Sequence, residues 1–165
     1  MVIDGQFPLC DKLRAIKPSD DWWFFQCARA QGNITEVYSK EEREALSVLQ
    51  EIFDNKWYLA MRERRKGFCA SQLLGGSQNT EGNMMRLASN ILRLGGISRL
   101  GRKVRDDLRS VTKHLDTALE LEIMGCFVES GFAVTPYPNL SNGSVPDGMV
   151  AVDVTDIYFE VTHNE

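Results

Sequence analysis

The chain has 165 residues, of which 43% are hydrophobic and 25% are charged, and its formal net charge is −4. This length suits one substantial domain or a helical module with a smaller one, and the composition is that of a soluble globular protein. No run approaches the roughly 20 apolar residues of a membrane span, and the N-terminus lacks a secretory signal pattern. We therefore expect a cytoplasmic protein that has no contact with a membrane.

The charged residues are unevenly distributed along the chain. Residues 62–113 contain twelve Lys or Arg against four Asp or Glu, whereas residues 114–165 contain nine acids and no Lys or Arg. A basic middle can attract an anionic polymer, and an acidic end can hold a cation. Both regions can equally neutralise each other inside one fold, so both interpretations stay open.

The first 100 residues are predicted to be mostly helical. An aromatic-rich segment after Ser19 is expected to form a helix that packs in the core. Ser39 and Glu42 then have the spacing of a capping box. The apolar residues that follow keep the three- and four-residue spacing of one helix face, which predicts a single helix ending at Gly67.

The middle of the chain is predicted to contain a loop and further helices. Residues 68–83 are rich in Gly, Ser and Asn, which is typical of a loop. A short amphipathic helix follows and ends at Gly95 and Gly96. The next segment supports one long helix up to Gly131, or two helices with a break near Gly101.

Three short β-like runs follow Gly131, and a turn at Thr155 and Asp156 separates the last two. The chain is therefore predicted to be an α+β protein. Its parts are a helical region, residues 1–100, and a helix followed by three strands, residues 101–165.

Two acids in the predicted last helix are expected to have different surroundings. At 100° per residue, Glu122 falls in the middle of an apolar stripe, whereas Glu120 points away with the surface positions. A carboxylate on a buried face is costly unless a cation or a hydrogen-bond donor neutralises it. We therefore expect Glu122 to have a function and Glu120 to be solvated.

The acids of the final strands are candidates for a metal site. A two-residue period places Glu160 and Thr162 on one face of the last strand, opposite Ile157 and Phe159, which suit a core. Asp147 can approach the same place from the neighbouring strand. Carboxylate and backbone oxygens that converge in this way suit Mg²⁺ or Mn²⁺.

These residues resemble the signature of the PD-(D/E)xK, or restriction-endonuclease-like, nuclease superfamily. That signature is a helical Glu, a Gly that opens a strand, then Pro-Asp, and about a dozen residues later Glu-x-Lys. The corresponding residues in this chain are Glu122, Gly131, Pro146, Asp147, Glu160, Val161 and Thr162. The predicted order of helix, strand, strand and strand is also similar to the first part of the family's core, so residues 101–165 resemble a partial αβββ core.

The resemblance implies a role for each matching residue. Asp147 and Glu160 are expected to bind Mg²⁺ or Mn²⁺, Val161 to offer its carbonyl oxygen, and Glu122 to complete the acidic cluster. Such a site activates water to attack a phosphodiester and neutralises the charge that develops in the transition state.

The chain departs from the family pattern in two ways. Thr162 stands where the family usually has a lysine, and a threonine can donate a hydrogen bond but carries no charge. The family core also continues with another helix and strand, whereas this sequence ends at Glu165. We therefore expect any cationic help to come from the basic middle, from another chain, or from a further C-terminal segment.

The basic residues of the long predicted helix are the expected contacts to nucleic acid. They are Arg99, Arg102, Lys103, Arg105 and Arg109. Because Asp106 and Asp107 interrupt this charge, salt bridges within the chain or to a partner are the alternative.

The sequence therefore predicts a metal-dependent nuclease, acting on DNA or RNA, or the N-terminal part of one. One alternative is a nuclease-like fold that no longer cuts and acts as a nucleic-acid- or protein-binding module. Another is a helical interaction protein in which the spacing of the acids is accidental. Three strands with one flanking helix leave an exposed sheet edge, which favours a homodimer.

Overall fold

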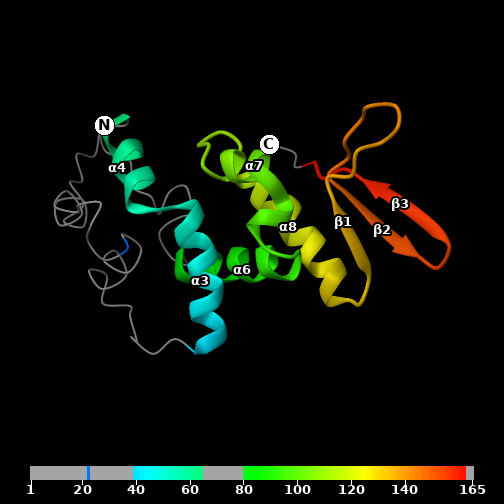
Figure 1. Ribbon diagram of the computed structural model, residues 1–165, viewed down its shortest axis with the longest axis horizontal. Coiled ribbons are helices and arrows are strands. Elements are labelled where there is room, and N and C mark those ends of the chain that lie inside the picture. The colour runs from blue at the N-terminus through cyan, green and yellow to red at the C-terminus, as the bar shows by residue number, and fades with distance from the viewer. Residues whose placement is uncertain (1–21, 23–38, 65–79, 163–165) are drawn as a thin grey trace, which may run out of the picture.

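The structure is a computed structural model that describes Trp22 and residues 39–64 and 80–162 (Figure 1). Its helices come first along the chain and its strands last, which confirms the predicted α+β class. The elements are α3 (Lys40–Ile52), α4 (Asn55–Arg64), α6 (Thr80–Arg93), α7 (Ile97–Leu108), α8 (His114–Glu129), β1 (Ala133–Pro136), β2 (Gly148–Val152) and β3 (Thr155–Phe159). Within these ranges, no helix has the length and apolar character needed to cross a membrane.

The capping box at the start of α3 is confirmed, but the single long helix predicted after it is wrong. The Ser39 hydroxyl accepts the Glu42 N–H at 3.1 Å, and the Glu42 carboxylate accepts the Ser39 N–H at 2.7 Å. The helix stops at Ile52, and α4 starts after Asp54, whose carboxylate accepts the N–H of Trp57 at 2.6 Å. Asp54 therefore caps a second helix, because a short acceptor at this position satisfies a free N–H of the new first turn.

The helix α6 ends just before Gly95 and Gly96, as predicted. Gly95 has a φ of 96°, and the N–H groups of Gly95 and Gly96 are bonded to carbonyl oxygens of the last turn at 2.9 and 2.8 Å. The start differs from the prediction, because α6 begins at Thr80 within the expected loop. The remainder of that loop lies outside the described residues, as do the expected helix after Ser19, except Trp22, and the expected helix end at Gly67.

The segment before Gly131, predicted as one long helix or as two helices with a break near Gly101, forms two helices, α7 and α8. The chain is interrupted at two places in this segment, one near Gly101 and one between the two helices. Gly101 has non-helical angles (φ 87°, ψ 177°), which confirms a kink within α7. A further interruption at residues 109–113 separates α7 from α8. The side chain of His114 stabilises this corner, because its Nδ1 donates to the Leu108 carbonyl at 2.7 Å.

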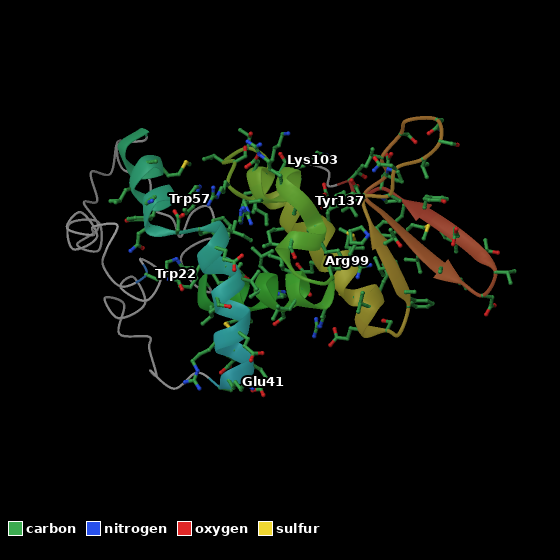
Figure 2. The ribbon with its side chains drawn as sticks, in the orientation of Figure 1. Trp22, Glu41, Trp57, Arg99, Lys103 and Tyr137 are labelled. Carbon is green, nitrogen blue, oxygen red and sulfur yellow. The ribbon has the colours of Figure 1, made fainter. Side chains whose placement is uncertain are left out.

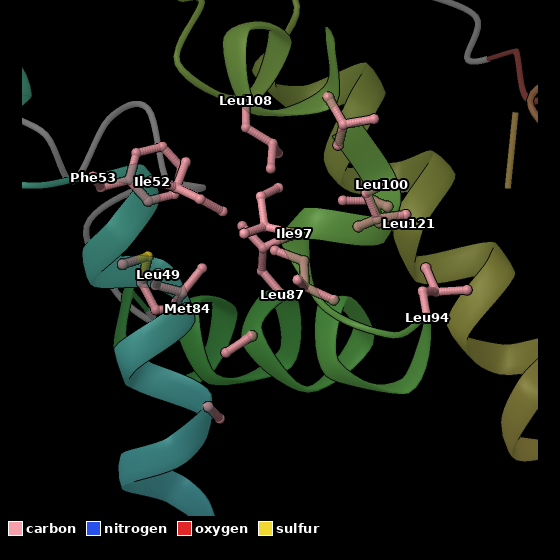
Figure 3. Packing of buried hydrophobic residues seen from close by; sticks show 14 of the residues in the cluster. Leu49, Ile52, Phe53, Met84, Leu87, Leu94, Ile97, Leu100, Leu108 and Leu121 are labelled. Carbon is pink, nitrogen blue, oxygen red and sulfur yellow. The ribbon is translucent and has the colours of Figure 1, made fainter. Parts of the chain in front are cut away.

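The hydrophobic core lies among α3, α6, α7 and α8. Its buried side chains are mostly large and apolar and come from all four helices, as Figure 3 shows for ten labelled positions. The largest fully buried ones are Leu49, Ile52, Phe53, Met84, Ile91, Leu94, Leu108, Leu121 and Met124. Trp22 joins this core, as expected: it is buried, and its indole N–H donates to the Phe53 carbonyl at 2.7 Å.

The strands form one antiparallel sheet in the order β1–β2–β3. Val134 of β1 and Val150 of β2 are paired and buried. At the end of the sheet where Phe159 of β3 pairs with Gly148 of β2, the ring centroid of Phe159 lies 5.3 Å from that of Phe127 on α8. In Figure 1, α8 lies between the other helices and the sheet, so it has neighbours on two sides.

Two predictions about the last hairpin are wrong. The turn lies at Asp153 and Val154, and Thr155 and Asp156 already belong to β3. Asp153 has a φ of 52°, a conformation that Asp adopts more readily than most residues. Ile157 was expected in the core but is 50% exposed, because it lies on the outer strand β3, beside the buried Val150 of β2.

Candidate functional site

Asp147 lies immediately before β2, where the ends of all three strands meet. Its carboxylate Oδ2 accepts the backbone N–H of Val161 at 2.7 Å. Its backbone carbonyl accepts the N–H of Tyr137, just after β1, at 3.0 Å. The next residue is Gly148, where a Cβ atom would lie 2.3 Å from the ring of Phe159. A glycine is therefore needed for β2 and β3 to approach each other beside Asp147.

Glu160 and Thr162 follow β3 directly and are exposed. The prediction that they belong to the strand is wrong, since β3 ends at Phe159. The chain nevertheless continues beside Asp147, because the N–H of Val161 donates to its carboxylate. The structure thus brings the Pro-Asp element and the Glu-Val-Thr element together, with the N–H of Val161 facing the carboxylate.

Glu122 does not lie on a buried face, so that expectation is wrong. Its side chain is 41% exposed and forms an ion pair with Arg86 of α6 at 3.2 Å. It also lines a cavity of about 250 Å³ between α6 and α8, together with Arg86 and His114, whereas Asp147 does not line it. Because α8 packs on α6 and also on β1, a single apolar stripe does not identify the side that faces the sheet.

Glu120 is the acid of α8 that faces the sheet, contrary to the prediction that it is solvated. It is half-buried, and its Oε2 accepts the hydroxyl proton of Tyr137 at 2.8 Å. Burial raises the pKa of Glu120, the hydrogen bond from Tyr137 lowers it, and the charge of Asp147 raises it further. Glu120 and Asp147 are therefore electrostatic neighbours, and we call Glu120, Tyr137 and Asp147 the Asp147 cluster.

Tyr137 is fixed at both its backbone and its hydroxyl. Its φ of 47° lies in the left-handed region, which bulky residues rarely adopt. The backbone bond to Asp147 and the hydroxyl bond to Glu120 hold it in this conformation. Burial, and then the Glu120 charge, raise the pKa of Tyr137, so the phenol stays protonated at neutral pH. Tyr137 was not predicted as a site residue. Its position between two prolines at the end of a predicted strand is the feature of the sequence that could have indicated it.

Two of the five predicted nucleic-acid contacts are partly buried. Arg109 donates from Nε to the Ile52 carbonyl and from a terminal nitrogen to the Glu51 carbonyl at 3.4 Å, so it caps the C-terminal end of α3. Arg105 is half-buried, and its Nε has no hydrogen-bond partner within the described ranges. These two residues are therefore poorly placed to bind an incoming polymer.

The other three predicted contacts are exposed on α7. Arg102 is paired with Asp106 at 3.5 Å, as the salt-bridge alternative predicts. Arg99 packs its side chain along Gly95. Lys103 lies over the ring of Tyr137, with 5.9 Å between Nζ and the ring centroid. Among these three, only Lys103 has a contact with the Asp147 cluster.

The donor set suits a hard cation only in part. In the described part of the chain, no group of three or more His, Cys, Asp or Glu is arranged to hold a metal ion. Mg²⁺ commonly uses one or two carboxylates and completes its coordination with water and substrate phosphates. Asp147 and Glu120 offer two carboxylates, which fit that kind of site better than a closed site made by protein ligands alone.

Comparison of the chain with family models, with curated proteins and with solved structures finds no match.

Proposed function

We propose that the chain is a nuclease-like module, or part of a nuclease, whose Asp147 cluster binds Mg²⁺ or Mn²⁺ together with a phosphate of DNA or RNA and hydrolyses the phosphodiester. The observation that carries this proposal is the hydrogen bond from Val161 to Asp147 at 2.7 Å. It places the two sequence elements that resemble the nuclease signature side by side, within the helix–strand–strand–strand order that the resemblance implies.

In this proposal Glu120 takes the role that the resemblance gave to Glu122. Glu120 shares an electrostatic environment with Asp147, whereas Glu122 is paired with Arg86 beside a different cavity. Burial raises the pKa of Glu120, and a bound divalent cation would act in the opposite direction by favouring the ionised form. Glu160 is exposed and precedes Val161, whose N–H is bonded to Asp147.

The bound cation would activate water and neutralise charge on the phosphate. The side chains of the protein have separate tasks. Asp147 and Glu120 would hold the ion, and Tyr137 orients the Glu120 carboxylate through its 2.8 Å hydrogen bond. The Asp147 carboxylate is itself oriented by the Val161 N–H, which leaves its second oxygen for the ion.

A cleavage assay with paired variants tests the proposal. Circular DNA and single-stranded RNA are incubated with the wild type in Mg²⁺ or Mn²⁺ and in EDTA. We expect metal-dependent cleavage, with a loss of roughly 100-fold or more in Asp147→Asn and Glu120→Gln. Glu122→Gln is the matched control on the same helix and should retain activity. Cleavage by Asp147→Asn at the wild-type rate would rule out the site.

A second candidate function is nucleic-acid binding without hydrolysis. It is favoured because both carboxylates already accept hydrogen bonds from protein groups and because Thr162 is uncharged. Oligonucleotide binding without cleavage under any metal condition would support this function over the first.

We further propose that the protein is cytoplasmic and that a second copy pairs with the edge of its sheet. The outer edge of the sheet is β3, where Ile157 is 50% exposed and Tyr158 is 45% exposed. An open edge with apolar side chains favours pairing with another strand.

A further inference from the structure

Lys103 stands next to the Asp147 cluster although it belongs to α7. Figure 2 shows Lys103 and Tyr137 near each other where the helices meet the sheet, and Nζ lies 5.9 Å from the ring centroid. The hydroxyl of the same Tyr137 donates to the Glu120 carboxylate at 2.8 Å. Lys103 is thus within electrostatic range of the carboxylate that Tyr137 holds.

Two neighbouring basic side chains form ion pairs with other acids. Arg102 pairs with Asp106 at 3.5 Å, and Lys113 pairs with Asp107 at 3.1 Å. Lys103 has no carboxylate within ion-pair distance in the ranges that the structure describes. Residues 114–165 contain no Lys or Arg. Lys103 is the basic side chain whose contact with this acidic site the structure shows.

We propose that Lys103 binds a nonbridging oxygen of the nucleic-acid phosphate at the Asp147 cluster. It supplies the positive charge that Thr162 lacks, and it comes from a helix that precedes the strands. The inference rests on the proposed function for the identity of its ligand. A cluster of carboxylates repels a phosphate, and an ammonium group a few ångströms away offsets that repulsion. The Tyr137 ring favours this position through a cation–π contact.

This arrangement makes opposite predictions for Lys103 and Glu120. The Lys103 ammonium attracts an anionic phosphate and repels a metal cation. Removing its charge therefore weakens phosphate binding but strengthens binding of Mg²⁺ or Mn²⁺. Removing the Glu120 charge does the reverse: it weakens metal binding and leaves metal-free phosphate binding intact or stronger. A lysine that only packs on Tyr137 would produce neither change.

The experiment measures two affinities separately. Binding of a fluorescein-labelled single-stranded DNA oligonucleotide is measured in EDTA by anisotropy at several salt concentrations, and Mn²⁺ binding is measured without DNA by calorimetry. The variants are Lys103→Gln, Lys103→Arg, Glu120→Gln and, as the matched control on α7, Arg102→Gln. A circular dichroism melt checks that each variant is folded.

We expect Lys103→Gln to bind the oligonucleotide more weakly and to reduce the slope of log affinity against log salt by about 0.7, the value for one lost contact to a single strand. Lys103→Arg should restore binding because it keeps the charge. Arg102→Gln should have the smaller effect, since Asp106 already neutralises Arg102. Mn²⁺ affinity should rise in Lys103→Gln and fall in Glu120→Gln.

The outcomes separate this inference from the proposed function. Equal losses in Lys103→Gln and Arg102→Gln, or no oligonucleotide binding by the wild type in EDTA, overturn the role of Lys103 whatever the cleavage assay shows. Conversely, if the wild type never cleaves but Lys103→Gln shows the expected opposite changes, the proposed hydrolysis fails and the phosphate contact of Lys103 stands.

Discussion

The packing of α6 against α8 leads to a sharp prediction at Gly125. A Cβ atom at this position would lie 2.3 Å from Oδ1 and 2.7 Å from Cγ of Asn90. Asn90 is only 3% exposed, and its Oδ1 accepts a hydrogen bond from Arg93 at 3.2 Å. In Gly125→Ala, therefore, either Asn90 moves and loses that bond or the two helices separate.

The expected free-energy change follows from three opposing effects. Alanine favours a helix by about 1 kcal/mol over glycine. Overpacking a close interface costs about 1–3 kcal/mol, and loss of the Arg93 bond costs about 1 kcal/mol more. The last effect offsets the propensity gain, so we expect Gly125→Ala to lower the free energy of unfolding by about 1–3 kcal/mol. For a chain of this length, each kcal/mol corresponds to a decrease in Tm of about 2–4 °C.

Urea and thermal unfolding, followed by circular dichroism, measure this change. The control is Gly82→Ala on α6, where no atom lies within 4 Å of the added Cβ, so it should be neutral or stabilising. Asn90→Ala combined with Gly125→Ala should recover most of the loss, because the clash is removed. If Gly125→Ala is as stable as Gly82→Ala, the close contact of α6 and α8 does not exist as described.

Three further predictions concern the corner at α8, the cap of α4 and the sheet edge. Burial lowers the pKa of His114 below its usual 6.5, so the unfolded chain binds a proton more readily than the folded chain does. The free energy of unfolding should therefore fall as pH drops through about 6.5, by up to about 1.4 kcal/mol per pH unit. Urea unfolding of His114→Asn should show a weaker dependence on pH. Asp54→Ala should cost about 1 kcal/mol in thermal unfolding because α4 loses its cap to Trp57, whereas Asp54→Ser should keep most of that stability. Light scattering at high concentration should show a dimer that Ile157→Lys weakens, and a clean monomer of the wild type would contradict pairing at the sheet edge.

Local signals in the sequence predicted the features that depend on neighbouring residues. Ser39 and Glu42 form the expected capping box, and the glycines at 95 and 96 end α6 as expected. Their chemistry is decided within a few residues, so no knowledge of the tertiary fold is required. Asp54 carried the same kind of signal, but the continuous apolar periodicity across it concealed the start of α4.

The identity of the acid that faces the sheet depends on tertiary structure and was therefore missed. Helical periodicity identifies the most apolar face of a helix. It does not show which neighbour covers each side of α8, where one side packs against α6 and another against β1. Glu122 lies on the α6 side with Arg86, and Glu120 lies on the sheet side with Tyr137. Only the position of β1, which returns along α8 after Gly131, distinguishes these two acids.

The uneven charge of the chain is partly explained by charge matching within the fold, which is one of the two interpretations that the sequence left open. Arg86 and Arg93 of α6 pair with acids of α8 at 3.2 and 3.1 Å, so part of the basic middle neutralises the acidic end. Such exposed pairs contribute little stability, about 0–1 kcal/mol each, so they are better explained as charge matching between helices. The same matching does not extend to the sheet, where the Asp147 cluster has Lys103 as its nearby cation. In the proposed function, a divalent cation together with an anionic phosphate is the ligand pair that would balance the charge of this cluster.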